Sequence, residues 1–366
     1  MKKFFYSLAV FALASACAQN TYTLKGTVTD ADLLPADAKA YLLDSKGTAI
    51  DSVELVNGSF TFTGEANPEI INTVAIKYPG KGTRERAWMM PFIPEKGSFN
   101  ATLSKTEWEI PGKNLTNEFN NFQKEVQDIY AGFLEETKDL PDDAEEEAEK
   151  RYDQAMAKIT ELSKETIAKN ADNYIALGAL QNIIYDLDLD EFDEILNKCG
   201  KFVGETESVK RIHDCKVAEV ATGEGKPFVD FAGKTPEGEA VKLSDFVGKG
   251  KWVLADFWAS WCGPCMREIP NIKKTHETLS GDKFTVLGVA VWETNGDNTK
   301  SAERMKEKEM TWPQIFVGDD KTPTDVYGIV GIPTMILFAP DGTICKRGEE
   351  LRGEKMMETV RDIINQ

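Results

Sequence analysis

Two cysteines separated by two residues, Cys262 and Cys265, carry the strongest chemical signal in the sequence. The apolar and aromatic run before them, residues 253–258, predicts a strand buried on both faces, and helical spacing begins after Cys265. Cys262 is therefore expected at or just before a helix start, where unpaired N–H groups and the helix dipole stabilise a thiolate. Cys265 lies on the same side of the first turn, close enough to form a disulfide with Cys262.

Thiol–disulfide exchange is the chemistry that this pair predicts, because exchange needs a thiolate nucleophile and a second thiol that resolves the mixed disulfide. Pro264 suits the first turn of the helix, since its missing N–H would have no intrahelical partner there. A zinc site is the alternative, but zinc needs four ligands, and the sequence has no second such cysteine pair and no histidine pair. We therefore expect no metal, and no cofactor other than a redox-active disulfide between Cys262 and Cys265.

The segment Asp256–Cys265, DFWASWCGPC, resembles the active-site segment of the thioredoxin superfamily. About seventy residues downstream, Gly331–Thr334 precedes another apolar run and resembles the cis-proline loop of that family. The strands and helix expected within residues 286–327 resemble the ResA/TlpA-like branch of the superfamily. The resemblance covers residues 226–366 and implies an α/β thioredoxin-like fold for the C-terminal domain.

The resemblance also implies roles for the residues around the pair. Cys262 would be the nucleophile and Cys265 the resolving thiol. Gly263 and Pro264 match the intervening residues of a reducing thioredoxin. Trp261 is expected to form an apolar platform beside Cys262.

Two acidic residues, Asp256 and Glu268, are expected to act on the cysteines. Asp256 lies within the apolar strand, so its carboxyl group should be buried and its pKa raised. The resemblance implies that Asp256 accepts the proton of Cys265 when the mixed disulfide is resolved, and the alternative is an aspartate held by local hydrogen bonds. Glu268 matches an acidic residue of ResA/TlpA-like proteins that tunes the cysteines, and the alternative is a surface charge.

Pro333, in cis, would bring the backbone of Ile332 beside the sulfurs, where an extended substrate can pair with it. The resemblance therefore implies a thiol–disulfide oxidoreductase whose partners are protein thiols and disulfides. The ResA/TlpA-like motifs favour a reductase, in cytochrome c maturation or in envelope redox homeostasis, supplied by an electron-donating envelope partner. An oxidase or isomerase of protein disulfides is the alternative within this class.

Functions of other classes have less support. A peroxiredoxin-like peroxidase shares the fold, but its peroxidatic cysteine usually follows Pro-x-x-x-Thr, and no such motif precedes Cys262. A non-catalytic envelope adaptor is disfavoured because the cysteine pair, Asp256 and Ile332–Pro333 are all intact. The formal net charge of −18 argues against a nucleic-acid partner, whose phosphates would be repelled.

The first residues predict export. Two lysines form a basic start, residues 4–14 are apolar, and small residues follow, which is typical of a signal segment and too short for a stable membrane span. The residues before Cys17 resemble a bacterial lipobox, although Leu13 stands four places before the cysteine instead of three. Cleavage that leaves Gln19 first is the alternative. We expect a signal segment over residues 1–18 and a periplasm-facing lipoprotein of the cell envelope, anchored to the membrane through lipidation of Cys17.

Hydrophobic periodicity divides the rest of the chain into three regions. Period-two alternation around an Asn57–Gly58 turn predicts a small antiparallel β-domain over residues 19–107, of sandwich or open-barrel type. It resembles the β-rich domain often fused to envelope thioredoxin-like proteins and carries no catalytic cluster, so we interpret it as a docking or spacing module. Helical spacing predicts an α-helical region over residues 108–222, and the thioredoxin-like domain follows over residues 223–366.

The remaining cysteines and a helical histidine have structural interpretations. Cys199, Cys215 and Cys345 are expected to be small buried hydrophobic residues. A disulfide between Cys199 and Cys215 stays open as an alternative, because spacing alone does not give its geometry. His213 is expected to be structural.

Overall fold

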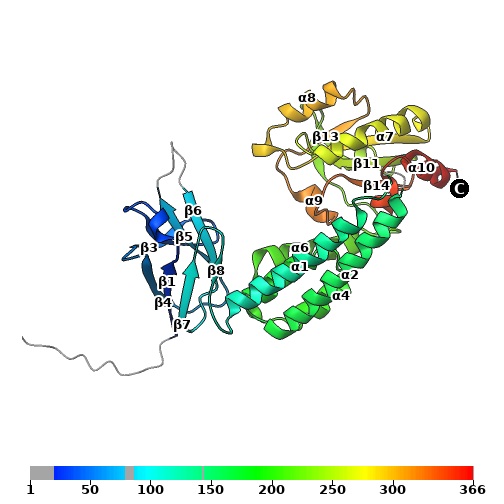
Figure 1. Ribbon diagram of the computed structural model, residues 1–366. Helices are drawn as coiled ribbons and strands as arrows, with labels where there is room; N and C mark the ends of the chain where they lie inside the picture. The colour runs from blue at the N-terminus through cyan, green and yellow to red at the C-terminus, as the bar shows by residue number, and fades with distance from the viewer. Residues whose placement is uncertain (1–19, 79–85, 142–143, 366) are drawn as a thin grey trace, which may run out of the picture. The chain divides into compact units, whose positions relative to one another are not determined.

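The computed structural model describes residues 20–78, 86–141 and 144–365 (Figure 1). The expected signal segment up to residue 18 and Cys17 lie outside the described residues. The chain forms two compact units, one of residues up to 183 with 195–204, and one of residues 184–194 with 205–366. Among the described residues, no helix is long and apolar enough to cross a membrane.

The first unit begins with two four-stranded sheets, in the orders β4-β1-β7-β8 and β3-β2-β5-β6. The strands are β1 (Thr21–Val28), β2 (Lys39–Leu43), β3 (Ala49–Glu54), β4 (Ser59–Glu65), β5 (Asn72–Tyr78), β6 (Arg86–Phe92), β7 (Gly97–Leu103) and β8 (Trp108–Glu109). Alternate side chains of both sheets form one apolar core, as the period-two pattern predicts. Asn57 and Gly58 both have positive φ, the conformation that the predicted two-residue turn requires.

One strand pair departs from the antiparallel arrangement expected for this domain. Strand β1 pairs with β4 antiparallel but with β7 in parallel. Parallel neighbours cannot be joined by a hairpin, and here the strands between β1 and β7 in the sequence provide the long connection. The period-two pattern shows which side chains point inward but not the direction of the neighbouring strand.

Helices follow the β-domain, as the change of period predicts. They are α1 (Leu115–Thr137), α2 (Glu145–Asn170), α3 (Tyr174–Ile183), α4 (Leu189–Leu196), α5 (Lys201–Glu205) and α6 (Glu207–Ala221). Asn114 is the N-cap residue of α1, and its side-chain oxygen accepts a hydrogen bond from the Asn117 backbone at 2.8 Å. Helix α2 packs on both α1 and α3.

The second unit is built on a seven-stranded sheet in the order β10-β9-β13-β12-β11-β14-β15. Its strands are β9 (Ala232–Lys234), β10 (Ala240–Lys242), β11 (Trp252–Trp258), β12 (Phe284–Ala290), β13 (Gln314–Phe316), β14 (Thr334–Phe338) and β15 (Ile344–Arg347). Its further helices are α7 (Gly263–Leu279), α8 (Thr299–Glu307), α9 (Thr322–Val326) and α10 (Met356–Ile364). Strand β11 runs parallel to β12 and antiparallel to β14.

Strand β11 has apolar layers on both sides, which confirms the prediction from its sequence. Leu254 and Trp258 are fully buried with residues of α7 and α10, two helices that pack on each other (Figure 1). Val253 and Phe257 are fully buried in the opposite layer. Asp256 shares the parity of Leu254 and Trp258 along the strand, so it faces the side that α7 covers.

Helix α6 packs within the second unit, on α9. Arg347 at the end of β15 donates hydrogen bonds to the Thr222 carbonyl at 3.2 Å and to the Tyr327 carbonyl at 2.9 Å. Gly328 has a φ of +61°, and a Cβ there would lie 2.2 Å from the Cys215 carbonyl oxygen of α6. The packed unit thus includes residues before 223, the expected start of the thioredoxin-like domain.

Cys199, Cys215 and Cys345 are free thiols, so the alternative disulfide between Cys199 and Cys215 is not formed. Cys215 is buried as expected, whereas Cys199 and Cys345 are half-buried. His213 lies 2.8 Å from the Asp193 carboxylate and its ring packs on Phe192. These contacts agree with a structural role for this histidine.

Candidate active site

A disulfide joins Cys262 and Cys265 at the N-terminus of α7. The two Cα atoms are 5.3 Å apart, and Cys262 is the N-cap residue of the helix. The backbone N–H of Cys265 points at the Cys262 Sγ, 3.1 Å away, so a donor that would stabilise a Cys262 thiolate is in place. Gly263 and Pro264 occupy the first turn and are exposed, with Pro264 where its missing N–H costs nothing.

The loop before β14 lies against the disulfide. Its Ile332–Pro333 peptide bond is cis, as the resemblance implies, and the Ile332 carbonyl oxygen is 3.7 Å from the Cys262 Sγ. Thr334 donates a hydrogen bond to the Gly331 carbonyl at 2.7 Å within the loop. The two sequence motifs meet because β14 is the direct neighbour of β11, so the loop at its start reaches the end of β11.

Exposed apolar side chains lie next to the disulfide. Trp261 is 57% exposed, and its Nε1 donates a hydrogen bond to the Trp292 carbonyl at 3.0 Å. Val330, two residues before Ile332, is 38% exposed. A pocket of about 370 Å³ is lined by Arg211, Trp292, Glu293, Asp319, Lys321 and Val330. Apolar surface beside polar groups is the kind of surface that another polypeptide contacts.

A buried acidic residue that the sequence did not suggest, Glu293, holds the turn before the cysteines. Glu293 is 3% exposed, and its carboxylate accepts hydrogen bonds from the Ser260 backbone at 2.6 Å and the Ser260 hydroxyl at 2.8 Å. Ser260 follows β11 and Glu293 follows β12, and the carboxyl ends of these parallel strands meet at one edge of the sheet. The position of both residues just after predicted parallel strands is the sequence feature that indicates their proximity.

Asp256 is buried beneath α7, and its side chain is 1% exposed. Neither of its carboxyl oxygens has a hydrogen-bond partner among the described residues, so the alternative of a locally hydrogen-bonded aspartate has no support. Its neighbours across the sheet are Gly288 and Met335, which carry no charge. Burial, with a smaller contribution from the Glu268 carboxylate, raises the pKa of Asp256 to about 8, while the positive charge of Arg352 acts in the opposite direction.

Glu268, on the second turn of α7, is half-buried instead of being an open surface charge. Its carboxylate accepts hydrogen bonds from the Gly353 backbone at 3.0 Å and the Asn271 side chain at 3.3 Å. Its charge raises the pKa of Asp256, so the two carboxyl groups interact electrostatically. Glu268 thus acts on Asp256 from the helix that begins at the disulfide, three residues after Cys265.

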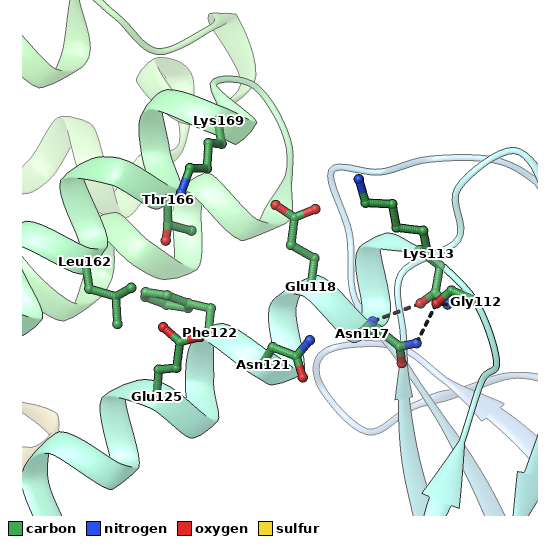
Figure 2. A pocket seen from close by; sticks show the side chains of 11 residues that line it. Gly112, Lys113, Asn117, Glu118, Asn121, Phe122, Glu125, Leu162, Thr166 and Lys169 are labelled. Carbon is green, nitrogen blue, oxygen red and sulfur yellow. Dashed lines mark hydrogen bonds between the residues drawn. The ribbon is translucent and has the colours of Figure 1, made fainter.

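A second pocket lies in the first unit (Figure 2). It has a volume of about 610 Å³ and is lined by residues of α1, α2 and the loop before α1. Figure 2 shows amide and charged side chains there, with Asn117 bonded to the Gly112 carbonyl. None of the cysteines lines this pocket. The described residues also contain no group of three or more histidine, cysteine or acidic side chains arranged to hold a metal.

Two parts of the chain match known protein families. Residues 225–347 match the AhpC/TSA family, and residues 22–119 match a domain of unknown function, DUF4369. The first match contains the cysteine pair and the cis-proline loop, and the second contains the β-domain.

Similar proteins share the C-terminal region. The thioredoxin-like protein YneN of Bacillus subtilis is 33% identical over 134 residues, which is 34% of this chain and 71% of YneN. The thiol-disulfide oxidoreductase ResA of Geobacillus thermodenitrificans is 32% identical over 127 residues, or 35% of this chain and 68% of ResA. A crystal structure of the thioredoxin domain of a Bacteroides vulgatus thiol-disulfide oxidoreductase is 32% identical, with 39% of this chain and 99% of that domain covered and a TM-score of 0.36.

Proposed function

Because the chain belongs, through its C-terminal domain, to the thioredoxin-like thiol–disulfide oxidoreductases, we propose that it reduces disulfides of protein substrates through Cys262 and Cys265. The observation that carries the proposal is the disulfide between these two residues at the N-terminus of α7. The closed pair is the oxidised state of a dithiol that has given two electrons to a substrate. Its surroundings supply groups suited to each step of that transfer.

The reaction has two steps. In the first, the Cys262 thiolate attacks a substrate sulfur, a Cys262–substrate disulfide forms, and the other substrate sulfur leaves as a thiolate. In the second, the Cys265 thiol gives its proton to the Asp256 carboxylate, and the resulting thiolate attacks the Cys262 sulfur. The Cys262–Cys265 disulfide closes and the second substrate sulfur leaves, so two electrons pass from the pair to the substrate.

The surroundings of Cys262 support its role as the nucleophile. The Cys265 N–H, 3.1 Å from the Cys262 Sγ, and the dipole of α7 both favour the thiolate over the thiol. The Ile332 carbonyl, 3.7 Å from the same sulfur, is in reach of a substrate backbone that lies along the cis-proline loop. Trp261 offers the exposed apolar surface that such a segment would contact. Cys262 and Cys265 are both buried, at 3% and 1% exposed, so their roles rest on the N-cap position of Cys262 and not on exposure.

The proposed direction is reduction, supported by the Gly263–Pro264 pair between the cysteines and by the ResA-type relatives. We expect the full chain to catalyse insulin reduction by dithiothreitol. We also expect it to equilibrate with glutathione at about −270 mV, the potential of a reducing thioredoxin, because direction follows from potential. A potential near −120 mV, typical of a strong oxidant, would contradict the reductase proposal and favour the oxidase. Peroxide consumption without insulin reduction would favour a peroxidase, and no turnover in either assay would favour an adaptor.

A reductase must be reduced again after each turnover. The oxidised Cys262–Cys265 pair therefore requires a dithiol partner that donates two electrons, which we propose to be an envelope redox protein. Apocytochrome disulfides and other oxidised envelope proteins are the proposed substrates, in cytochrome c maturation or envelope redox homeostasis. Mixed disulfides trapped in cells on a Cys265→Ser chain would identify them by mass spectrometry, and absence of any haem-binding Cys-x-x-Cys-His peptide would count against the cytochrome route.

We propose that the protein faces the periplasm and is held by a lipid on Cys17. The basic start, the apolar run and the lipobox-like residues before Cys17 support this location. Cys17→Ala should block lipid attachment, so we expect the variant to be recovered in the soluble fraction or as unprocessed precursor, while wild type fractionates with membranes. Metabolic labelling with a radiolabelled fatty acid distinguishes the two proteins. Normal processing and unchanged membrane association of Cys17→Ala would contradict lipidation and favour a cleaved signal segment.

A further inference from the structure

The segment after β15 is packed against the strand that pairs with Asp256. The backbone N–H of Gly348 donates a hydrogen bond to the Met335 carbonyl at 3.1 Å, and Met335 is the residue of β14 opposite Asp256. Leu351, three residues further on, is fully buried in the same apolar cluster as Cys265. This segment is therefore fixed in the core beside the redox pair, although it lies about ninety residues away in the sequence.

The end of the same segment binds the other carboxylate of the site. The backbone N–H of Gly353 donates to the Glu268 carboxylate at 3.0 Å. Leu351 in the core and Gly353 on Glu268 fix the backbone on either side of Arg352. Arg352 is thus held next to the α7 turn that covers Asp256.

The Arg352 guanidinium is partly buried and only partly paired. Its Nη1 donates to the Glu349 carboxylate at 2.6 Å, and the side chain is 27% exposed. Its Nε is buried and has no hydrogen-bond partner among the described residues, as is true of both Asp256 carboxyl oxygens. Buried polar atoms without partners are uncommon in folded proteins, so the Arg352 Nε and the two Asp256 oxygens each need an explanation.

Few charged groups face Asp256. Glu268 comes from α7 and Arg352 from the segment after β15, whereas the strand neighbours Gly288 and Met335 are uncharged. The pKa of Asp256 reflects both charges, since burial and Glu268 raise it and Arg352 lowers it. Arg352 is thus the one cation that acts appreciably on Asp256 within the part of the chain that the structure describes.

We propose that Arg352 is a positioning residue for the proton transfer from Cys265, and that its guanidinium balances the paired negative charges of Asp256 and Glu268 as Asp256 ionises. The proposal rests on the proposed function, in which the Asp256 carboxylate takes the Cys265 proton. An ionised Asp256 next to an ionised Glu268 in a poorly solvated site would be unfavourable without a nearby cation. Arg352 supplies that charge without touching the sulfurs.

The proposal predicts opposite effects for two charge-removing variants. Arg352→Gln removes the positive charge, so ionised Asp256 becomes less favourable, and the pH at which resolution reaches half its maximal rate should rise by about one unit. Glu268→Gln removes the negative charge and keeps an acceptor for Gly353, so the same midpoint should fall. Below the midpoint, Arg352→Gln should therefore resolve mixed disulfides about tenfold more slowly than wild type, because the ionised fraction of Asp256 falls by that factor.

The measurement uses the full reduced chain with a limiting amount of 5,5′-dithiobis(2-nitrobenzoate) in a stopped-flow instrument. The first release of chromophore reports attack by Cys262, and the second reports resolution by Cys265. Arg352→Lys, which keeps the charge, should retain a midpoint near wild type. Arg304→Gln is the matched control, because it also removes an arginine paired with a glutamate three positions away, on α8. A carbon-13 NMR titration of the Asp256 carboxyl group in the oxidised chain should show its pKa shifting in the same directions in Arg352→Gln and Glu268→Gln, without any turnover.

The outcomes separate this proposal from the function it rests on. If Arg352→Gln changes neither midpoint nor carboxyl titration, or if Arg304→Gln changes them equally, the role of Arg352 is wrong while that of Asp256 stands. If Asp256→Asn resolves at the wild-type rate with the wild-type pH profile, the proton-acceptor role fails, and this proposal with it. If Arg352→Gln does not fold, Arg352→Met, which keeps the apolar stem, provides the same charge change.

Discussion

Cys262→Ser will abolish disulfide exchange, whereas Cys265→Ser will attack a substrate disulfide once and then remain bound to it. A serine hydroxyl at position 262 is not a thiolate at neutral pH, so the first step cannot begin, and insulin reduction should fall by on the order of a thousandfold or more. In Cys265→Ser the nucleophile and the N-terminus of α7 remain, but no thiol is present to resolve the mixed disulfide. The measurement is insulin turnover for both variants, with mass spectrometry of the adduct on Cys262.

Alkylation kinetics test the same asymmetry in the reduced wild-type chain. The helix start should lower the pKa of the Cys262 thiol, so iodoacetamide at mildly acidic pH should label Cys262 well before Cys265. Cys345→Ser is the control for both experiments, because Cys345 is a half-buried free thiol whose pKa burial raises. It should leave insulin turnover unchanged. Equal labelling of Cys262 and Cys265 would contradict the assignment of roles, and faster labelling of Cys265 would reverse it.

The parts of this site that the sequence predicts are those with a local signal. Cys262 and Cys265 follow a strand whose apolar run is long enough to indicate burial on both faces, and the start of helical spacing locates them at a helix N-terminus. The burial of Asp256 follows from the same run, since a residue inside a doubly covered strand has no route to solvent. Pro333 was found by its motif, not by any physical pattern.

The residues that the sequence does not suggest act through contacts between distant segments. Arg352 stands among other charged residues, and Glu293 directly follows an apolar run, but the spacing of neither residue shows what it contacts. Their positions depend on which loops the order of strands brings to the same edge of the sheet. Hydrophobic periodicity predicts the strands but not their order. For the same reason the sequence does not show where α6 packs. Its spacing predicts one more helix of the middle region, but α6 belongs to the second unit, where Arg347 binds the Thr222 carbonyl at its C-terminal end.

The second large effect concerns stability and pH. Asp256→Asn should make the oxidised protein more stable than wild type at alkaline pH. In wild type the pKa of Asp256 is near 3.9 in the unfolded chain and about 8 in the folded protein, chiefly because of burial. Below the unfolded-state pKa the carboxyl group is protonated in both states, so its ionisation does not change the free energy of unfolding. As pH rises from about 4 to about 8, the unfolded chain releases the proton while the folded protein retains it, so the free energy of unfolding falls.

The asparagine variant has no proton to release and therefore lacks this pH window. At pH 9 the difference in unfolding free energy should favour Asp256→Asn by on the order of 5 kcal/mol, and at pH 4 the two proteins should be nearly equal. Denaturant titrations of both oxidised chains across this range give the measurement. Asp282→Asn, an exposed carboxylate after α7 in the same unit, is the matched control and should follow the wild-type curve.

The same burial that destabilises wild type at alkaline pH makes Asp256 useful in the reaction. A carboxyl group with a pKa of about 8 holds a proton firmly near neutral pH, and its carboxylate is basic enough to accept one from the Cys265 thiol. Resolution in wild type should therefore accelerate as pH rises through about 8, and Asp256→Asn should lose that acceleration while the first attack by Cys262 stays nearly intact. Stability curves that run parallel from pH 4 to pH 9 would mean that Asp256 ionises as easily in the folded protein as in the unfolded chain. The proton-acceptor role would then have no physical basis, and resolution would have to rely on solvent.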